Sequence, residues 1–438
     1  MSKSVLRSAL GAAVPHRKNT AAMETVRMPL PSRIVLPVSQ HIGAPAVPVV
    51  KKGDHVDVGT MVAQPGSYVS AGIYSGVSGT VTEITTLMLA NGSETPAIVI
   101  TPDGAQTVDP AVCPPNVTDA ESFLAAVRAS GLVGQGGAGF PTHVKLSPRD
   151  PSAIRYLLIN GAECEPYITA DHRTLLEDGE DVYLGVKAVQ NFLGIPKALI
   201  CIERNKPDAI DCMFKLTARD PDVEVKPLPS RYPQGAEKIL IETAVGREVP
   251  AGGLPADAGV IVLNVATAAF IAKYLRTGMP LTTTRLTVDG EAVVRRQNVE
   301  VIIGTPIQEV LDFCGGVSED VGKVLMGGPM MGVALPNTDY PVLKQNNAIL
   351  AFKDKDSHVP EATACIHCAR CINACPMGLA PVQIAAAWRQ EDVAQLNKLH
   401  AELCMECGTC SFVCPAMRPV TQTMRLAKAM QRAKGGKK

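Results

Sequence analysis

Eight cysteines in the last quarter of the chain stand in two runs with the same spacing. Each run reads C-x2-C-x2-C-x3-C and is followed by proline; the runs are Cys365, Cys368, Cys371, Cys375 and Cys404, Cys407, Cys410, Cys414. This spacing is typical of proteins that hold two [4Fe–4S] clusters, in which three thiolates bind one cluster and the displaced fourth binds the other. We therefore predict that Cys414 completes the first set of three and Cys375 the second. Two zinc sites are the alternative, but zinc usually takes its ligands as two C-x2-C pairs and does not explain a triplet.

The composition indicates which partners the chain lacks. A length of 438 residues corresponds to about three domains, and a hydrophobic content of 46% is enough for buried cores. Aromatic residues make up 4% of the chain, and Lys+Arg and Asp+Glu are equal at 42 each. These values argue against stacking on nucleic-acid bases and against an overall attraction to DNA, so we expect no nucleic-acid partner.

The sequence also predicts a protein without a transmembrane segment. No apolar run approaches the roughly 20 residues of a membrane span, and residues 1–25 lack the apolar core of a signal peptide. Of 13 cysteines, the five outside the two runs are scattered. This pattern favours reduced thiols in the cytoplasm over a disulfide framework.

Residues 28–100 have short Val- and Ile-rich runs broken by glycine, which is typical of β-strands. The phrases VPVVKKGDHVDVGTMVAQ (47–64) and IYSGVSGTVTEI (73–84) resemble the lipoyl/biotinyl barrel-sandwich fold, in which glycines allow tight corners and valines fill a small core. Carrier domains of that kind present a lysine between the two halves. Residues 64–72 contain none, so we expect a barrel that packs or docks and carries no attached group.

The segment GLVGQGGAGFPTHVKL (131–146) has glycines that let a backbone approach a phosphate closely. A strand-like run, 154–160, follows it and ends in NGAECEP, which carries Asn160, Glu163 and Glu165. Alternating helix-like and strand-like segments then continue to about residue 272. Such alternation predicts a parallel sheet that binds ligands at the carboxyl ends of its strands.

These two segments resemble the flavoprotein subunit of respiratory complex I, in which similar motifs hold FMN and admit NADH. The resemblance implies that Lys145 contacts the phosphate or the flavin and that Phe140 stacks on the nicotinamide nucleotide. It implies further that Asn160, Glu163 and Glu165 hydrogen-bond flavin and nucleotide hydroxyls. The loop residues that would line the flavin and its phosphate are Gly134, Gly136, Gly137, Ala138 and Gly139.

Two further matches to that family follow along the chain. Tyr232, Gly235 and Glu237 match a Y-x-x-G-x-E pattern that flanks the nicotinamide pocket, and Asn264 and Thr267 match an FMN-contacting turn. Three positions depart from the family pattern, and they concern the nucleotide more than the flavin. They are Gln135 in place of an arginine, Ala162 in place of an aspartate and Ala236 in place of a glutamate.

From residue 284 the pattern returns to β, with a hairpin at Asp289-Gly290 and an amphipathic helix near Thr305. This part resembles the small ubiquitin-like (SLBB) domain that follows the flavin domain in the same flavoprotein of complex I. We expect the GGPMMG turn (327–332) to pack back on the flavin domain. Apolar residues at helical spacing separate the two cysteine runs, which resembles an α-helical ferredoxin module. We expect His367 to lie beside its cluster without binding it.

We therefore predict a multidomain α/β protein, and its order of parts resembles the RnfC proteins of the Rnf complex from about residue 16 to 428. That complex is an ion-translocating ferredoxin:NAD+ oxidoreductase. The expected parts are an N-terminal arm (1–27), a barrel-sandwich hybrid (28–110), a Rossmann-like FMN/NADH-binding domain (115–280), a ubiquitin-like β-grasp domain (281–335), a linker (336–360) and a helical two-cluster ferredoxin domain (361–438).

The resemblance implies an enzyme subunit that exchanges hydride between NAD(H) and FMN and passes single electrons through two [4Fe–4S] clusters to or from ferredoxin. It also implies other subunits of a membrane complex as partners and a peripheral location on the cytoplasmic face of the membrane. Three alternatives stay open at this point: a soluble NADH-dependent corrinoid (cobalamin) reductase, an electron-transfer protein associated with proline reductase, and a non-catalytic iron–sulfur wiring subunit.

Overall fold

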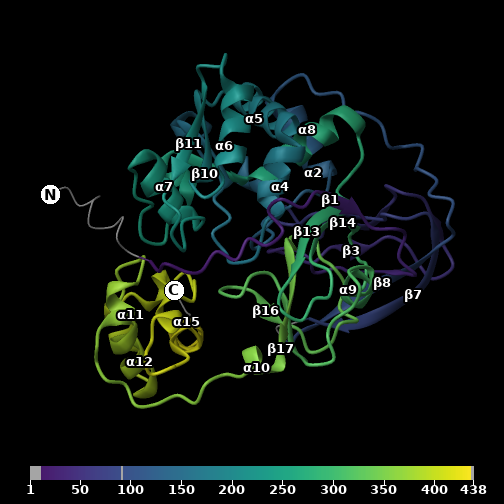
Figure 1. Ribbon diagram of the computed structural model, residues 1–438. Coiled ribbons are helices and arrows are strands. Elements are labelled where there is room, and N and C mark those ends of the chain that lie inside the picture. The colour runs from purple at the N-terminus through teal and green to yellow at the C-terminus, as the bar shows by residue number, and fades with distance from the viewer. Residues whose placement is uncertain (1–10, 90–91, 436–438) are drawn as a thin grey trace.

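The computed structural model describes residues 11–89 and 92–435, and Figure 1 shows the arrangement of their helices and strands. The elements form four modules, in agreement with a multidomain α/β protein. The yellow-green helical module lies below the teal parallel-sheet module, and a green mixed sheet lies between the helical module and the purple barrel (Figure 1).

The barrel module consists of short antiparallel strands in two sheets, ordered β2-β8-β7-β4 and β3-β5-β6. Ile34, Leu36, Val62 and Ile98 are fully buried in its core. The strands are β2 (Ile34–Pro37), β3 (Val47–Pro48), β4 (His55–Val56), β5 (Met61–Gln64), β6 (Ile73–Tyr74), β7 (Gly79–Met88) and β8 (Glu94–Pro102).

The second module has a parallel sheet ordered β11-β10-β9-β12. Its strands are buried along most of their length because helices pack against them. The strands are β9 (Tyr156–Gly161), β10 (Lys197–Glu203), β11 (Val223–Leu228) and β12 (Val260–Asn264). The helices are α2 (Ala120–Ala129), α3 (Thr142–Lys145), α4 (Ala170–Glu177), α5 (Gly179–Leu193), α6 (Pro207–Thr217), α7 (Glu237–Val245) and α8 (Val265–Thr277).

The third module is a mixed sheet ordered β1-β14-β13-β17-β15-β16, with α9 packed in its core. Its strands are β1 (Thr25–Arg27), β13 (Thr283–Asp289), β14 (Gln297–Ile302), β15 (Val321–Met326), β16 (Val333–Ala334) and β17 (Ala348–Lys353). The helices are α9 (Ile307–Phe313) and α10 (Asp354–Ser357).

Two strands of this sheet correct the predicted domain map. β17 lies inside the predicted linker, yet it is a central strand that pairs with β13 and β15. Its residues Ala348–Ala351 are fully buried. The sequence did not predict this strand because polar and proline-rich residues surround the short apolar run. Composition alone does not show which apolar run completes a sheet. β1 lies inside the predicted arm and pairs with only three residues of β14.

The helical module holds both cysteine runs. Ile384, Leu396 and Met424 are buried in its small core. Its helices are α11 (Arg370–Asn373), α12 (Pro381–Arg389), α13 (Val393–Lys398), α14 (Thr409–Phe412) and α15 (Val420–Gly435). The short helices α11 and α14 each carry the third cysteine of one run, so the two runs fold in the same way.

Residues 11–20, which we call the N-terminal strap, join three modules. The Gly11 N–H donates to the Ala374 carbonyl oxygen (3.1 Å) in the helical module. Ala12 pairs with Tyr232 of the parallel-sheet module. Asn19 Nδ2 donates to the Asp289 carboxylate (3.1 Å) of the mixed sheet. The strap is irregular, as predicted, but its contacts fix it against all three.

Candidate redox site

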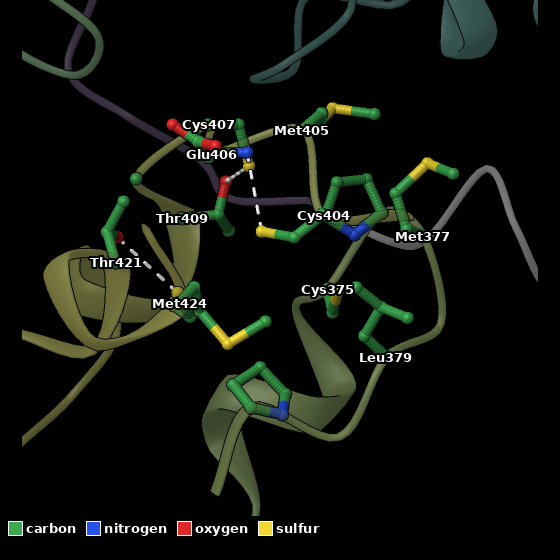
Figure 2. Close-up of a pocket in the computed structure, with 14 residues that line it drawn as sticks. Cys375, Met377, Leu379, Cys404, Met405, Glu406, Cys407, Thr409, Thr421 and Met424 are labelled. Carbon is green, nitrogen blue, oxygen red and sulfur yellow. Dashed lines mark hydrogen bonds between the residues drawn. The ribbon is translucent and has the colours of Figure 1, made fainter. Parts of the chain in front are cut away.

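Four cysteines line one pocket of the helical module, which Figure 2 shows with Met424 and Leu379 on its wall. We call them the inner quartet; they are Cys375, Cys404, Cys407 and Cys410. Three of the sulfurs have hydrogen bonds within the chain. The Glu406 N–H donates to Cys404 Sγ at 3.4 Å, and hydroxyl oxygens lie 3.3 Å from Cys407 Sγ and 3.5 Å from Cys410 Sγ.

A second pocket is lined by the outer quartet, which is Cys365, Cys368, Cys371 and Cys414. The structure thus brings the fourth cysteine of each run beside the first three of the other. The two quartets differ in burial: three cysteines of the inner quartet are buried, whereas Cys368 of the outer quartet is exposed and its other members are half-buried. His367 is exposed and lines the outer pocket.

Both pockets fit a multi-atom cluster better than a single ion. Each pocket is lined by four cysteines, three from one run and the fourth from the other, which is the ligand set of a [4Fe–4S] cluster. In the part of the chain that the structure describes, no group of three or more His, Cys, Asp or Glu side chains is arranged to hold a single metal ion. Burial raises the pKa of Cys404 to about 11 and of Cys410 to about 12, so these thiolates require bound positive charge, which iron supplies.

The predicted glycine loop forms an open cradle above the carboxyl ends of β9 and β12. Gly136 and Gly139 have positive φ values of 70° and 68°, and a Cβ on Gly137 would meet nothing within 4 Å. The Gln135 N–H donates to Thr267 Oγ1 (3.2 Å), which anchors the loop on α8. Among the described residues, no group accepts a hydrogen bond from the N–H of Gly137 or Ala138. Free amides in an open glycine loop fit the phosphate of a flavin nucleotide.

Asn160 and Asn264 lie side by side at the ends of these two strands. Asn160 Nδ2 donates to the Gly235 carbonyl oxygen at 2.8 Å. Asn264 caps α8 through the Ala266 N–H and donates to Asp171 Oδ2 at 2.7 Å. Burial, followed by the nearby Glu163 charge, raises the pKa of Asp171 to about 7.

Lys145 and Glu237 are brought together at the edge of the cradle. Lys145 Nζ lies 2.5 Å from Glu237 Oε1, and both side chains are partly exposed. Phe140 is half-buried, and its carbonyl oxygen closes the loop by accepting from the Gly134 N–H at 2.9 Å. The lysine is therefore near the loop, but its ammonium already has a carboxylate partner.

The NGAECEP turn is held by a buried lysine of the strap. Lys18 Nζ donates to the carbonyl oxygens of Glu163 (2.7 Å), Glu165 (2.9 Å) and Ile168 (2.6 Å). Burial lowers the pKa of Lys18 to about 8, opposed by the Glu163 charge. The Glu163 carboxylate is itself buried and accepts from the Asp171 N–H at 2.6 Å, so it supports the turn from inside.

The Glu165 carboxylate binds the GGPMMG turn. Its oxygens accept from the N–H groups of Met330 (3.0 Å) and Met331 (2.9 Å). A Cβ on Gly328 would lie 2.3 Å from Glu165 Oε2, so any side chain there would push the Glu165 carboxylate out of its place. Burial raises the pKa of Glu165 to about 7 in spite of the two donors. The turn therefore packs on the parallel-sheet module, as expected, and the Glu165 carboxylate joins the two modules.

Tyr232 joins the parallel-sheet module to the inner quartet. It is 1% exposed, and its hydroxyl donates to the Cys407 carbonyl oxygen at 2.7 Å. Cys164 packs against the same apolar cluster and accepts from the Gly235 N–H at 3.4 Å. Burial raises the pKa of Cys164 to about 12. Contacts therefore run without a break from the strand ends to Cys407.

Sequence reasoning missed several residues that shape this site. The Gln345 carbonyl oxygen accepts from the Gly136 N–H (3.2 Å), and Asn347 Nδ2 lies 3.5 Å from the place of a Cβ on Gly136. Both come from the predicted linker. Lys18 comes from the predicted arm. None of the three had a motif around it, and each acts through a partner more than 140 residues away.

Four family models match the chain in the order of its modules. They describe an RnfC barrel sandwich hybrid domain (7–105), a Nuo51 FMN-binding domain (127–273), an SLBB domain (285–334) and a 4Fe-4S dicluster domain (364–417). The fold and the site therefore define a flavin- and iron–sulfur-containing electron-transfer protein.

Curated relatives show which family of this class the chain belongs to. The chain is 43% identical, over 85% of its length and 85% of the relative, to the RnfC protein of the Na(+)-translocating ferredoxin:NAD(+) oxidoreductase complex of Acetobacterium woodii. It is 41% identical, over 96% of its length and 92% of the relative, to the proton-translocating counterpart of Clostridium ljungdahlii. The chain belongs to the RnfC family of the Rnf complex. The relatives and the barrel match do not favour a corrinoid reductase, a proline-reductase protein or a non-catalytic subunit.

A solved structure shares the fold. The NAD+-reducing [NiFe]-hydrogenase in its air-oxidized state aligns over 71% of this chain and 63% of its own, with a TM-score of 0.52 and 18% sequence identity. At this identity the likeness concerns the fold alone. No helix in the described ranges is long and apolar enough to cross a membrane.

Proposed function

We propose that the chain exchanges hydride between NAD(H) and FMN and passes single electrons through two [4Fe–4S] clusters to or from ferredoxin. The proposal places it, with other subunits, in an ion-translocating complex. The observation that carries this proposal is the hydrogen bond from Tyr232 to the Cys407 carbonyl oxygen. It joins the inner quartet to the turn that holds Gly235, whose carbonyl oxygen accepts from Asn160.

The described residues suit FMN at the cradle. Bound FMN exchanges two electrons with a nicotinamide and one at a time with clusters. We assign the flavin and its phosphate to Asn160, Asn264, Thr267 and the loop. Lys145 and Glu237 hold the edge of the cradle as an ion pair, and Phe140 and Gly235 border the place of the nucleotide. Glu163, Glu165 and Tyr232 hold the turns around the site in place. The loop residues are Gly134, Gly136, Gly137, Ala138 and Gly139.

The two quartets would each hold one cluster through crossed ligation. The inner cluster takes Cys375 with Cys404, Cys407 and Cys410, and the outer cluster takes Cys414 with Cys365, Cys368 and Cys371. Electrons then pass from flavin to the inner cluster to the outer cluster, or the reverse, because the inner quartet is buried against the flavin module and the outer one reaches the surface.

The remaining parts of the proposal concern folds and location. We infer a barrel-sandwich hybrid at 28–110, a Rossmann-like FMN/NADH domain at 115–280, a ubiquitin-like β-grasp domain from 281 to about 353, and a helical ferredoxin domain at 361–438. The strap lies within 1–27. The chain would bind peripherally to membrane subunits on the cytoplasmic side.

An anaerobic absorbance titration of the reconstituted protein with NADH tests this function. We expect the flavin bands and the broad iron–sulfur absorbance to bleach together. A protein without flavin, or one whose clusters respond to dithionite but not to NADH, would be a relay that cannot take electrons from the nucleotide and would contradict the proposal.

A further inference from the structure

The flavin cradle is bordered by the mixed sheet as well as by the parallel sheet. Residues 345–347, just before β17, lie against the glycine loop. The Gln345 carbonyl oxygen accepts from the Gly136 N–H at 3.2 Å, and the Asn347 carbonyl oxygen accepts from the Thr287 N–H of β13 at 3.0 Å. Backbone hydrogen bonds therefore fix this segment both on the loop and on its own sheet.

Two side-chain amides, one from each sheet, converge on Gly136. A Cβ at this glycine would lie 3.3 Å from Asn264 Nδ2 and 3.5 Å from Asn347 Nδ2. The positive φ of Gly136, 70°, favours glycine, so no side chain of the loop takes this place. A ligand atom there would lie between the two amide nitrogens.

The two amides differ in their partners. Asn264 Oδ1 accepts from the Ala266 N–H and Asn264 Nδ2 donates to Asp171 Oδ2 (both 2.7 Å), so one N–H of this amide remains. The half-buried Asn347 side chain has no hydrogen bond to any residue in ranges 11–89 and 92–435. Gln345 Oε1 is buried and is without a hydrogen-bond partner in the same ranges. Buried polar groups are normally paired, so these amides suit a ligand with polar groups of its own.

Asn347 Nδ2 is close to the part of the loop to which we assign the phosphate. Gly137 and Ala138, whose N–H groups are free among the described residues, are the next residues of that loop. Lys145 does not supply an unpaired charge, because its ammonium lies 2.5 Å from Glu237 Oε1. The donors identified at this end of the cradle are therefore neutral. Neutral N–H groups can hold a phosphate, and a hydrogen bond to a charged acceptor is stronger than one to a neutral acceptor.

We infer that Asn347 is a further FMN ligand, contributed by the mixed sheet, and that its amide nitrogen donates to the phosphate. The inference rests on the proposed function in placing FMN at the cradle. It goes beyond that function because the flavin site then requires two modules. The parallel-sheet module provides the loop and Asn264, and the mixed sheet provides a second donor.

The test uses the full-length protein with its clusters in place and its flavin removed. FMN and riboflavin, which lacks the phosphate, are the two probes, and the free flavin after ultrafiltration gives each Kd. The variants are Asn347→Ala, which removes the donor, and Asn347→Asp, which keeps the size but brings a carboxylate to the phosphate. The matched controls are Asn337→Ala and Asn337→Asp, the same changes at an exposed position between β16 and β17.

We expect the Kd of FMN to rise about tenfold in Asn347→Ala, because one hydrogen bond to a charged group is lost. Asn347→Asp should raise it by about a hundredfold, because the carboxylate repels the phosphate. The Kd of riboflavin should stay within about twofold of wild type in both variants, which also shows that the site is folded. Both Asn337 controls should bind FMN as the wild type does.

Three results would overturn the inference. An unchanged Kd of FMN in both Asn347 variants would show that this side chain does not touch the flavin. Equal weakening of FMN and riboflavin would show that Asn347 supports the loop and does not hold the phosphate. A wild type that binds riboflavin as tightly as FMN would show that the loop holds no phosphate. All three leave the proposed function standing, whereas a wild type that binds neither flavin would overturn that function together with this inference.

Discussion

Cys375 and Cys414 are the residues on which the arrangement of the two clusters depends. Each is followed by proline and lies in the pocket formed by the other run. The spacing predicted this exchange from the sequence, because three residues between the third and fourth cysteines carry the last thiol away from its own triplet.

Exchanging these two cysteines for serine should affect opposite clusters. We expect Cys375→Ser to perturb the signal of the cluster bound by Cys404, Cys407 and Cys410, and Cys414→Ser to perturb the other, because each removes one thiolate of four. Electron paramagnetic resonance of the dithionite-reduced proteins measures this. If each serine altered the cluster of its own run, the crossed ligation would be wrong.

The free energy of unfolding should depend on pH through Glu165. Its pKa is raised by burial to about 7 from an ordinary 4.5, so the folded state holds a proton that the unfolded state releases between these values. The contribution of Glu165 to stability should therefore be complete below about pH 4.5 and fall by on the order of 1–3 kcal/mol as pH rises through 7. Urea unfolding across this range should show a shallower fall in Glu165→Gln, whereas exposed Glu121→Gln should behave as wild type. An unchanged slope in Glu165→Gln would refute the assignment.

The N-terminal strap is the element that sequence reasoning undervalued. It forms no helix and has no motif, yet Lys18 holds three carbonyl groups of the NGAECEP turn. The parallel sheet and its helices were predictable because local periodicity fixes each of them. The strap and β17 were not, since their structure depends on partners far away in the sequence.

Replacing Lys18 with methionine should loosen the flavin site. Three buried carbonyl groups lose their donor, which we expect to cost about 2–4 kcal/mol and to weaken FMN binding at least tenfold. Fluorescence titration of the apoprotein with FMN measures the Kd. Lys52→Met, on an exposed corner of the barrel, is the control. FMN affinity equal to wild type in Lys18→Met would show that the strap does not shape the site.

At the scale of the whole molecule, Lys344 connects the barrel to the flavin module. This fully buried residue lies in the segment before β17, and its ammonium donates to the carbonyl oxygens of Gly72 in the barrel and Gly131 beside the flavin loop. Burial lowers its pKa to about 7. The sequence predicted the modules one by one, but not this joint, because a lysine among polar residues has the pattern of an exposed linker.

Lys344→Met should separate the barrel from the flavin module. Two buried carbonyl groups lose their partner, at about 1–3 kcal/mol each. Because the folded pKa lies below the unfolded value, wild-type stability should also rise with pH between 7 and 10.5, and the variant should lose this rise. Urea midpoints at pH 7 and 9 measure both effects, with exposed Lys355→Met as control. A variant as stable as wild type at both pH values would contradict this role.

Within the described chain, the inner cluster should lie on the only route between the flavin and the outer cluster. Rapid mixing of NADH with reconstituted Cys404→Ala and Cys368→Ala proteins, followed by freeze-quench paramagnetic resonance, tests it most directly. We predict that NADH reduces the inner cluster of Cys368→Ala at the wild-type rate but fails to reduce the outer cluster of Cys404→Ala, which dithionite still reduces. Rapid reduction of that outer cluster by NADH would contradict the account.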